Sequence, residues 1–157
     1  MQERFELFTS SISQIYRCIQ KLKNAGMAEL GLQGKHTMCI YYLSRHGEGL
    51  TSAELCALCE EDKAAVSRTL AELEERGYVS CPTPDGKKKY RTKVFLTPSG
   101  KAVSQRIDEV VEAAVRQGGA GLTERQRQDF YRTLVSIAEN LRKFSTEGGS
   151  PPDALAQ

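Results

Sequence analysis

The chain has 157 residues, 39% apolar and 27% charged, an ordinary balance for a globular protein, and no apolar run approaches the roughly 18 residues of a membrane span. The N-terminus has neither the basic cluster nor the apolar core of a signal peptide, so we expect a cytoplasmic protein. The net charge of +2 is too small to indicate nucleic-acid binding by itself.

Two helices are predicted in the first third of the chain. Apolar residues at steps of three and four line one side of the first helix, which is expected to end before Gly26. A second helix fits residues 37–46, with Gly47 as the left-handed residue that ends it. The apolar side of the first helix consists of Phe5, Phe8, Ile12, Ile15, Ile19 and Leu22.

A strong helix start signal follows. Thr51 and Glu54 can form a capping box, while Leu50 and Leu55 occupy the positions of a hydrophobic staple. These two devices predict a short helix over residues 52–60.

The fourth helix is predicted over residues 62–76. The Asp62 carboxylate can cap its first amides, and Gly77 follows its last residue. Its apolar stripe is narrow, so the opposite face should point outward. The stripe is Val66, Leu70 and Leu73, and the outward face is Lys63, Ala64, Ser67, Arg68 and Ala71.

The pattern then changes from helical to β-rich. Residues 78–81 and 90–96 are rich in β-formers, and they flank a turn of Pro, Asp and Gly at residues 82–86. This arrangement predicts a β-hairpin.

Two more helices complete the predicted fold. Pro98 suits the first position of one helix, which ends at Gly118-Gly119, and a second capping box at residues 122–126 starts the other. Residues 145–157 contain Gly and Pro but almost no bulky side chain, so we expect a disordered tail. The apolar stripes are Val103, Ile107, Val110, Val111 and Ala114 in the first of these helices, and Phe130, Leu134, Ile137, Leu141 and Phe144 in the second.

The two short helices over residues 52–60 and 62–76 match a helix-turn-helix, in which the second helix lies in the major groove of DNA. Groove entry needs small side chains near the helix start and long donors that reach base edges. Ala64, Ala65 and Ser67 are small, and Lys63 and Arg68 are long donors. Because arginine can bind guanine through two hydrogen bonds, Arg68 is the main candidate for sequence specificity.

Positive charge is concentrated around this helix and the hairpin. Residues 62–101 hold nine basic and five acidic side chains, so this quarter of the chain can attract phosphate. Lys87, Lys88, Lys89 and Arg91 cluster at the hairpin tip, where they would contact the DNA backbone or minor groove. The alternative is that this lysine-rich turn is a solvated loop. The predicted DNA-binding residues are Ser52, Lys63, Ala64, Ser67, Arg68, Lys87, Lys88, Lys89 and Arg91.

Four segments together resemble the MarR family of bacterial transcription regulators. The resemblance covers residues 34–104 closely and the outer helices by length and order. The segments are Leu50-Thr51-Ser52-Ala53-Glu54-Leu55, Asp62-Lys63-Ala64-Ala65-Val66-Ser67-Arg68, Leu73-Glu74-Glu75-Arg76-Gly77-Tyr78-Val79 and Leu96-Thr97-Pro98-Ser99-Gly100.

The resemblance implies a mainly α fold with a small β-hairpin wing, that is, a winged helix-turn-helix with dimerisation helices at both ends. On this basis residues 1–33 and 98–144 form the dimerisation region, residues 34–97 the DNA-binding domain and residues 145–157 the tail. It further implies a homodimer on a pseudo-palindromic site, commonly a repressor that a small ligand or oxidant releases. The family's wing carries Asp-X-Arg, whereas Lys88-Lys89-Tyr90 stand here, which displaces the wing arginine to Arg91.

Dimerisation is also expected from the outer helices themselves. Each presents a stripe of at least five large apolar residues, and a small central domain offers too little surface to cover both. The alternative is that the two stripes pack on each other within one chain.

Several residues could carry chemistry, but simpler interpretations are available for each. The five cysteines are odd in number and expected to be reduced; Cys56 and Cys59 form a C-x-x-C without a second zinc pair and are interpreted as core residues. Cys18 is a candidate redox sensor.

Histidines 36 and 46 are interpreted as surface or capping residues, and no metal site is expected. Tyr16, Tyr41 and Tyr42 either line an effector pocket or belong to the core, which we favour.

Other function classes have less support. No Gly-rich phosphate loop, catalytic His and carboxylate pair or nucleophile motif indicates an enzyme, and no cofactor is expected. A winged helix that binds another protein, or a thiol-based redox sensor, remains the alternative to a DNA-binding regulator.

Overall fold

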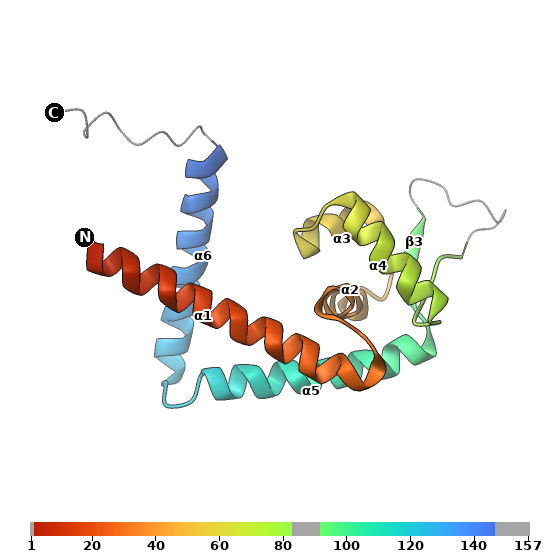
Figure 1. The fold of residues 1–157 in the computed structure, drawn as a ribbon, viewed down its shortest axis with the longest axis horizontal. Helices are drawn as coiled ribbons and strands as arrows, with labels where there is room; N and C mark the ends of the chain where they lie inside the picture. Colours follow the sequence, from red (N-terminus) through yellow and green to blue (C-terminus); the bar gives the residue numbers. More distant parts are fainter. Residues whose placement is uncertain (1, 83–91, 147–157) are drawn as a thin grey trace. The chain divides into compact units, whose positions relative to one another are not determined.

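A computed structural model describes residues 2–82 and 92–146 (Figure 1). Within these ranges the chain is mainly helical with a small antiparallel sheet, as predicted. Residues up to Val115 and those from Arg116 on form two separate compact units. The elements are α1 (Gln2–Met27), η1 (Ala28–Leu30), α2 (Gly34–Arg45), β1 (Leu50–Thr51), α3 (Ser52–Cys59), α4 (Lys63–Glu75), β2 (Val79–Ser80), β3 (Lys93–Leu96), α5 (Pro98–Gly118) and α6 (Glu124–Thr146).

The predicted helix starts are confirmed by their capping hydrogen bonds. The Glu54 amide donates to the Thr51 hydroxyl at 3.3 Å, and the Thr51 amide donates to the Glu54 carboxylate at 2.7 Å, which completes the capping box of α3. The Ala65 amide donates to the Asp62 carboxylate at 2.7 Å at the start of α4. Thr123 and Gln126 form the same reciprocal pair before α6.

Two predicted helix ends are wrong. α1 runs through Gly26 to Met27 because Gly26 does not adopt the left-handed conformation that ends a helix; the left-handed glycine is Gly31, with φ 62°. Gly26 lies close against α5, where a Cβ atom would lie 2.6 Å from a methyl carbon of Val110. After α2, the left-handed residue is Gly49 with φ 75°, not Gly47. A Cβ atom at Gly49 would lie 2.9 Å from the carbonyl oxygen of Val94, which is too close. Only glycine therefore fits at this position, just before β1 pairs with β3.

Two further boundaries differ from the prediction. α2 begins at Gly34, three residues early, because Gln33 and His36 cap each other at its start. α6 continues to Thr146, two residues into the predicted tail. Both terminal hydroxyls, of Ser145 and Thr146, donate to the Arg142 carbonyl and satisfy it within the last turn. Residues 147–157 of that predicted tail lie outside the described residues.

The sheet has three strands in the order β1-β3-β2. β2 and β3 pair antiparallel with Val79 opposite Leu96, which confirms the predicted hairpin strands. β1 pairs with the other edge of β3, with Leu50 opposite Val94, and was not predicted because it has only two residues. Strand β1 leads directly into α3, so the sheet fixes the start of the helix-turn-helix.

One apolar core joins α2, α3, α4, the sheet and the first half of α5. The predicted stripe of α4 lies fully within it, and the predicted staple residues Leu50 and Leu55 are both buried. The buried apolar residues are Met27, Leu32, Cys39, Ile40, Leu43, Leu50, Leu55, Val66, Leu70, Leu73, Val79, Val94, Val103 and Ile107. α4 is therefore held rigidly from one side.

The first and last helices, α1 and α6, differ from this core because their large apolar side chains are exposed. Phe5 is 68% exposed in α1, and Phe144 is 54% exposed in α6. The other exposed apolar residues are Leu7, Phe8, Ile12, Ile15, Tyr16, Ile19 and Leu22 in α1, and Phe130, Tyr131, Val135 and Leu141 in α6. Across residues 2–82 and 92–146, no helix combines the length and apolar character needed to cross a bilayer.

Candidate nucleic-acid interface

The outward face of α4 is exposed, as predicted. Val66, Leu70 and Leu73 point into the core, and the side chains on the opposite side of the helix are open to solvent. Those exposed residues are Lys63, Ala64, Ser67, Arg68 and Ala71. A helix held by one face and free on the other has the arrangement that major-groove insertion requires.

The connection between α3 and α4 is tight. Glu60 adopts a left-handed conformation with φ 54°, and the Glu61 amide donates to the Cys56 carbonyl at 3.2 Å. Asp62 then caps α4 directly. Ser52, the first residue of α3, is half-buried. The predicted helix-turn-helix is therefore present in the chain.

The strands beside α4 lead to the predicted wing. Three residues separate the end of α4 from the start of β2, and Gly77, at φ 73°, makes the turn between them. The Lys93 ammonium group, at the start of β3, donates to the Glu48 carbonyl at 3.0 Å. The predicted wing contacts, Lys87, Lys88, Lys89 and Arg91, lie outside the described residues and stay predictions.

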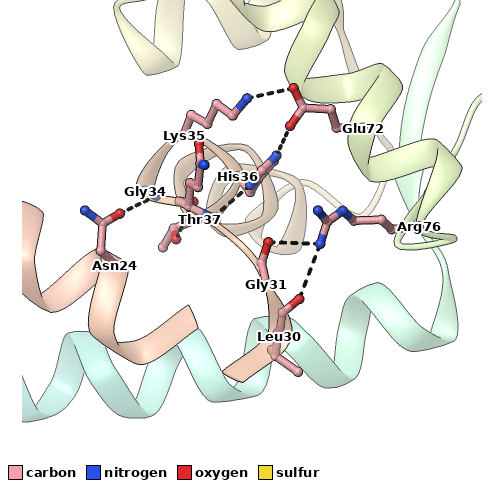
Figure 2. Close-up of polar contacts among 10 residues, drawn as sticks. Asn24, Leu30, Gly31, Gly34, Lys35, His36, Thr37, Glu72 and Arg76 are labelled. Atoms are coloured by element: carbon pink, nitrogen blue, oxygen red, sulfur yellow. Dashed lines mark hydrogen bonds and ion pairs between the residues drawn. The ribbon is translucent and has the colours of Figure 1, made fainter. Parts of the chain in front are cut away.

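A buried histidine joins α2 to the exposed helix α4 (Figure 2). His36 is 1% exposed, and its Nε2 lies 2.7 Å from a carboxylate oxygen of Glu72. The Gln33 amide donates to Nδ1 at 2.9 Å, so the neutral ring carries its proton on Nε2 and donates it to Glu72. The interpretation of His36 as a capping residue is confirmed, but it is not a surface residue.

Two more polar contacts hold the C-terminal end of α4. The Lys35 ammonium group lies 2.7 Å from the second oxygen of Glu72, and these hydrogen bonds from Lys35 and His36 lower the pKa of Glu72. Arg76, the residue that follows α4, donates to the carbonyl of Gly31 at 2.9 Å (Figure 2). Sequence patterns missed these contacts because they join residues more than 30 positions apart.

We expect His36 to make stability depend on pH. Burial lowers the pKa of His36 below its ordinary value of about 6.5, so the unfolded chain takes up a proton before the folded chain does. The stabilisation is complete above about pH 6.5 and is lost as the pH falls below it. Urea unfolding at pH 7.5 and 5.5 should show a larger loss for the native chain than for His36→Gln. An equal loss in both proteins would contradict this assignment, since His46 is present in each.

The tyrosines named as candidate pocket residues occupy two different places. Tyr41 and Tyr42 pack against the core with their rings edge to face at 5.5 Å, whereas Tyr16 is exposed on α1. An open hollow of about 520 Å³ lies where α1, η1 and the start of α2 meet. Its lining includes Gln20, Asn24, Leu32, Gln33 and Lys35, and none of the three tyrosines.

The cysteines also fall into separate groups. Cys18, the predicted redox candidate, is exposed on α1. Cys56 and Cys59 pack against the core, as expected for that C-x-x-C. The Cys59 sulfur also lies 4.0 Å from the sulfur of buried Cys39, a contact that sequence did not predict. Among the residues that the structure describes, no group of three or more His, Cys, Asp or Glu side chains could hold a metal ion.

Comparison with known proteins agrees with this geometry. A sequence profile described as the MarR family matches residues 30–89. HTH-type transcriptional repressors of Mycobacterium tuberculosis and Mycobacterium bovis are 32% identical over 119 residues, which cover 74% of this chain and 83% of the relatives.

Solved structures that resemble this chain are also of MarR family proteins. A MarR family protein of Mycobacterium tuberculosis, crystallised with DNA, is 28% identical with a TM-score of 0.63 over 82% of this chain and 95% of that one. A complex of that protein with salicylic acid gives a TM-score of 0.61 at 28% identity, over 80% and 92% of the two chains. A regulator from Silicibacter pomeroyi, also described as MarR family, has a TM-score of 0.70 at 26% identity, over 82% and 86%.

Proposed function

The chain belongs to the MarR family of transcription regulators, and from this premise we propose that it is a repressor that binds double-stranded DNA as a homodimer. The observation that carries the proposal is the exposed outward face of α4, with Lys63, Ser67 and Arg68 opposite a buried apolar stripe. Transcription regulation is not an enzymatic activity, and the curated relatives are named repressors.

In this proposal α4 enters the major groove. Ala64 and Ser67 leave room for the helix backbone to approach the bases, and Lys63 and Arg68 reach polar groups on base edges. Ser52, at the start of α3, contacts a phosphate, where hydroxyl groups and helix N-termini commonly bind. Lys87, Lys88, Lys89 and Arg91 contact the backbone or the minor groove beside it.

The exposed apolar faces of α1 and α6 are proposed to form the dimer interface. Side chains such as Phe5, Ile15, Phe130 and Phe144 would remain in water in a single chain, although large apolar patches are rare on monomers. In this arrangement residues 1–33 and 98–144 dimerise and residues 34–97 bind DNA. A two-fold dimer presents two copies of α4 to half-sites about one helical turn, or about 34 Å, apart.

A small effector is part of the proposal. A relative was crystallised with salicylic acid, and the hollow beside α1 and α2 offers polar groups from Gln20, Asn24 and Lys35 to such a carboxylate. Lys35 also pairs with Glu72 of α4, at 2.7 Å. An anion that competes for Lys35 would therefore weaken a contact that holds α4, the helix proposed to enter the major groove. We propose the hollow as the effector site.

Selection of DNA fragments from a random pool, followed by a salt titration, tests the proposed function. We expect a consensus with two-fold symmetry, because each protomer reads one half-site. Affinity for that site should fall by roughly 10³ between about 50 and 200 mM salt if the dimer makes about six phosphate contacts. A flat salt response, or no DNA selected at all, would favour a winged helix that binds another protein.

A further inference from the structure

Two cysteines outside the DNA-binding surface lie in contact. Cys39 is buried in the middle of α2, and Cys59 is the half-buried last residue of α3, with 4.0 Å between the two sulfur atoms. We propose that Cys39 and Cys59 form a peroxide-reactive dithiol that closes to an intrachain disulfide and thereby weakens DNA binding. The second half of this proposal rests on the proposed function, and the first half does not.

The two thiols have unequal environments, which assigns their roles. The hydrogen bond with Cys39 lowers the pKa of Cys59, and the charge of Lys23 acts in the same direction against burial and Glu61. The same hydrogen bond and burial raise the pKa of Cys39. Cys59 is also the more accessible of the pair. Cys59 is therefore the thiolate that meets the oxidant, and Cys39 is the resolving thiol.

The chemistry needs one molecule of hydrogen peroxide for each disulfide. The Cys59 thiolate attacks one peroxide oxygen, the O–O bond breaks, and the departing hydroxide takes up a proton and leaves as water. The Cys39 sulfur then attacks the sulfur of the resulting sulfenic acid, and the S–O bond breaks. The leaving hydroxide takes the Cys39 proton and becomes the second water. Two thiols lose two electrons, and the peroxide gains them.

Closing the disulfide must move the end of α3. A disulfide bond is about 2.05 Å long, so the sulfur atoms must approach each other by about 2 Å. Cys39 lies in the middle of α2 within the core, whereas Cys59 is the last residue of α3. We therefore expect the end of α3 to move toward Cys39.

That movement reaches the DNA-binding helix through the tight turn. Glu60, in its left-handed conformation, follows Cys59 directly, and Asp62 caps α4 two residues later. Displacing this turn shifts the first turns of α4, which carry Lys63 and Arg68. We expect DNA affinity to fall roughly tenfold, a factor comparable to the loss of one good base contact.

The test treats the full chain with hydrogen peroxide, blocks remaining thiols by alkylation and maps the peptides by mass spectrometry. We expect a peptide that links Cys39 to Cys59, together with a roughly tenfold weaker affinity for the selected DNA that dithiothreitol restores. Cys59→Ser should remove both effects. Cys56→Ser, on the same helix and similarly half-buried, and Cys18→Ser, which removes the exposed thiol, should retain both.

The possible outcomes separate the inference from the proposed function. Absence of the linked peptide in a chain that binds DNA when reduced overturns the dithiol and leaves the repressor proposal intact. A linked peptide with unchanged DNA affinity overturns the coupling between α3 and α4. Failure of the reduced chain to bind DNA overturns the proposed function, while the linked peptide still decides whether the dithiol reacts.

Discussion

Gly100→Ala is expected to destabilise the protein by about 3 kcal/mol, the upper end of the usual cost of overpacking. A Cβ atom at Gly100 would lie 2.0 Å from the carbonyl oxygen of Tyr78, a distance that no relaxed contact allows. That carbonyl cannot easily retreat, because it accepts a hydrogen bond from the Thr97 amide at 3.1 Å. The Thr97 hydroxyl also donates to the Gly77 carbonyl at 2.6 Å, so α5 is tied to the chain just before β2.

Urea unfolding of the native chain, Gly100→Ala and Gly118→Ala measures this effect. Gly118 ends the same helix, has nothing within 4 Å of a built Cβ and has no positive φ. Alanine there should be neutral or should stabilise by up to about 1 kcal/mol, since alanine favours helix more than glycine does. Equal free energies of unfolding for the two variants would show that the backbone at Tyr78 yields more easily than its hydrogen bonds indicate.

The features that sequence predicted correctly are those with local causes. The caps at Thr51, Asp62 and Thr123 depend on residues three positions apart, and each appears in the structure with the expected hydrogen bonds. The narrow stripe of α4 predicted which of its faces is buried, because helical periodicity depends only on spacing. For the same reason the spacing of Arg68 from that stripe is enough to place it on the outward face.

The features that sequence missed depend on contacts between distant segments. β1 exists because β3 lies beside it, and two residues are too few for a strand pattern. The contact between Cys39 and Cys59 spans 20 positions, and nothing near Cys39 marks it. His36 carried one local signal, its spacing from Gln33, but glutamine followed by histidine is a rare form of the capping box.

Replacing Arg68 with alanine is expected to relax base preference at one position of each half-site while the dimer stays intact. Arg68 is exposed on the outward face of α4, where a guanidinium group can bind guanine through two hydrogen bonds. Losing such a pair costs about 1–3 kcal/mol for each half-site, or roughly 5- to 150-fold in affinity. Because the residue is solvent-exposed and lies opposite the core, the free energy of unfolding should change by less than about 0.5 kcal/mol.

Two comparisons show whether the loss at Arg68 concerns bases or charge alone. Arg106→Ala removes the same charge from α5, where Arg106 pairs with Glu109 at 2.9 Å, and should leave base preference unchanged. Neutralising Lys87, Lys88 and Lys89 should weaken binding to every sequence about equally and reduce the salt dependence, because phosphates carry no sequence information. Binding titrations on the selected site and on its single-base variants measure all three. If Arg68→Ala changes neither affinity nor base preference, α4 is not the helix that reads the major groove, since a bidentate contact cannot be removed without either effect.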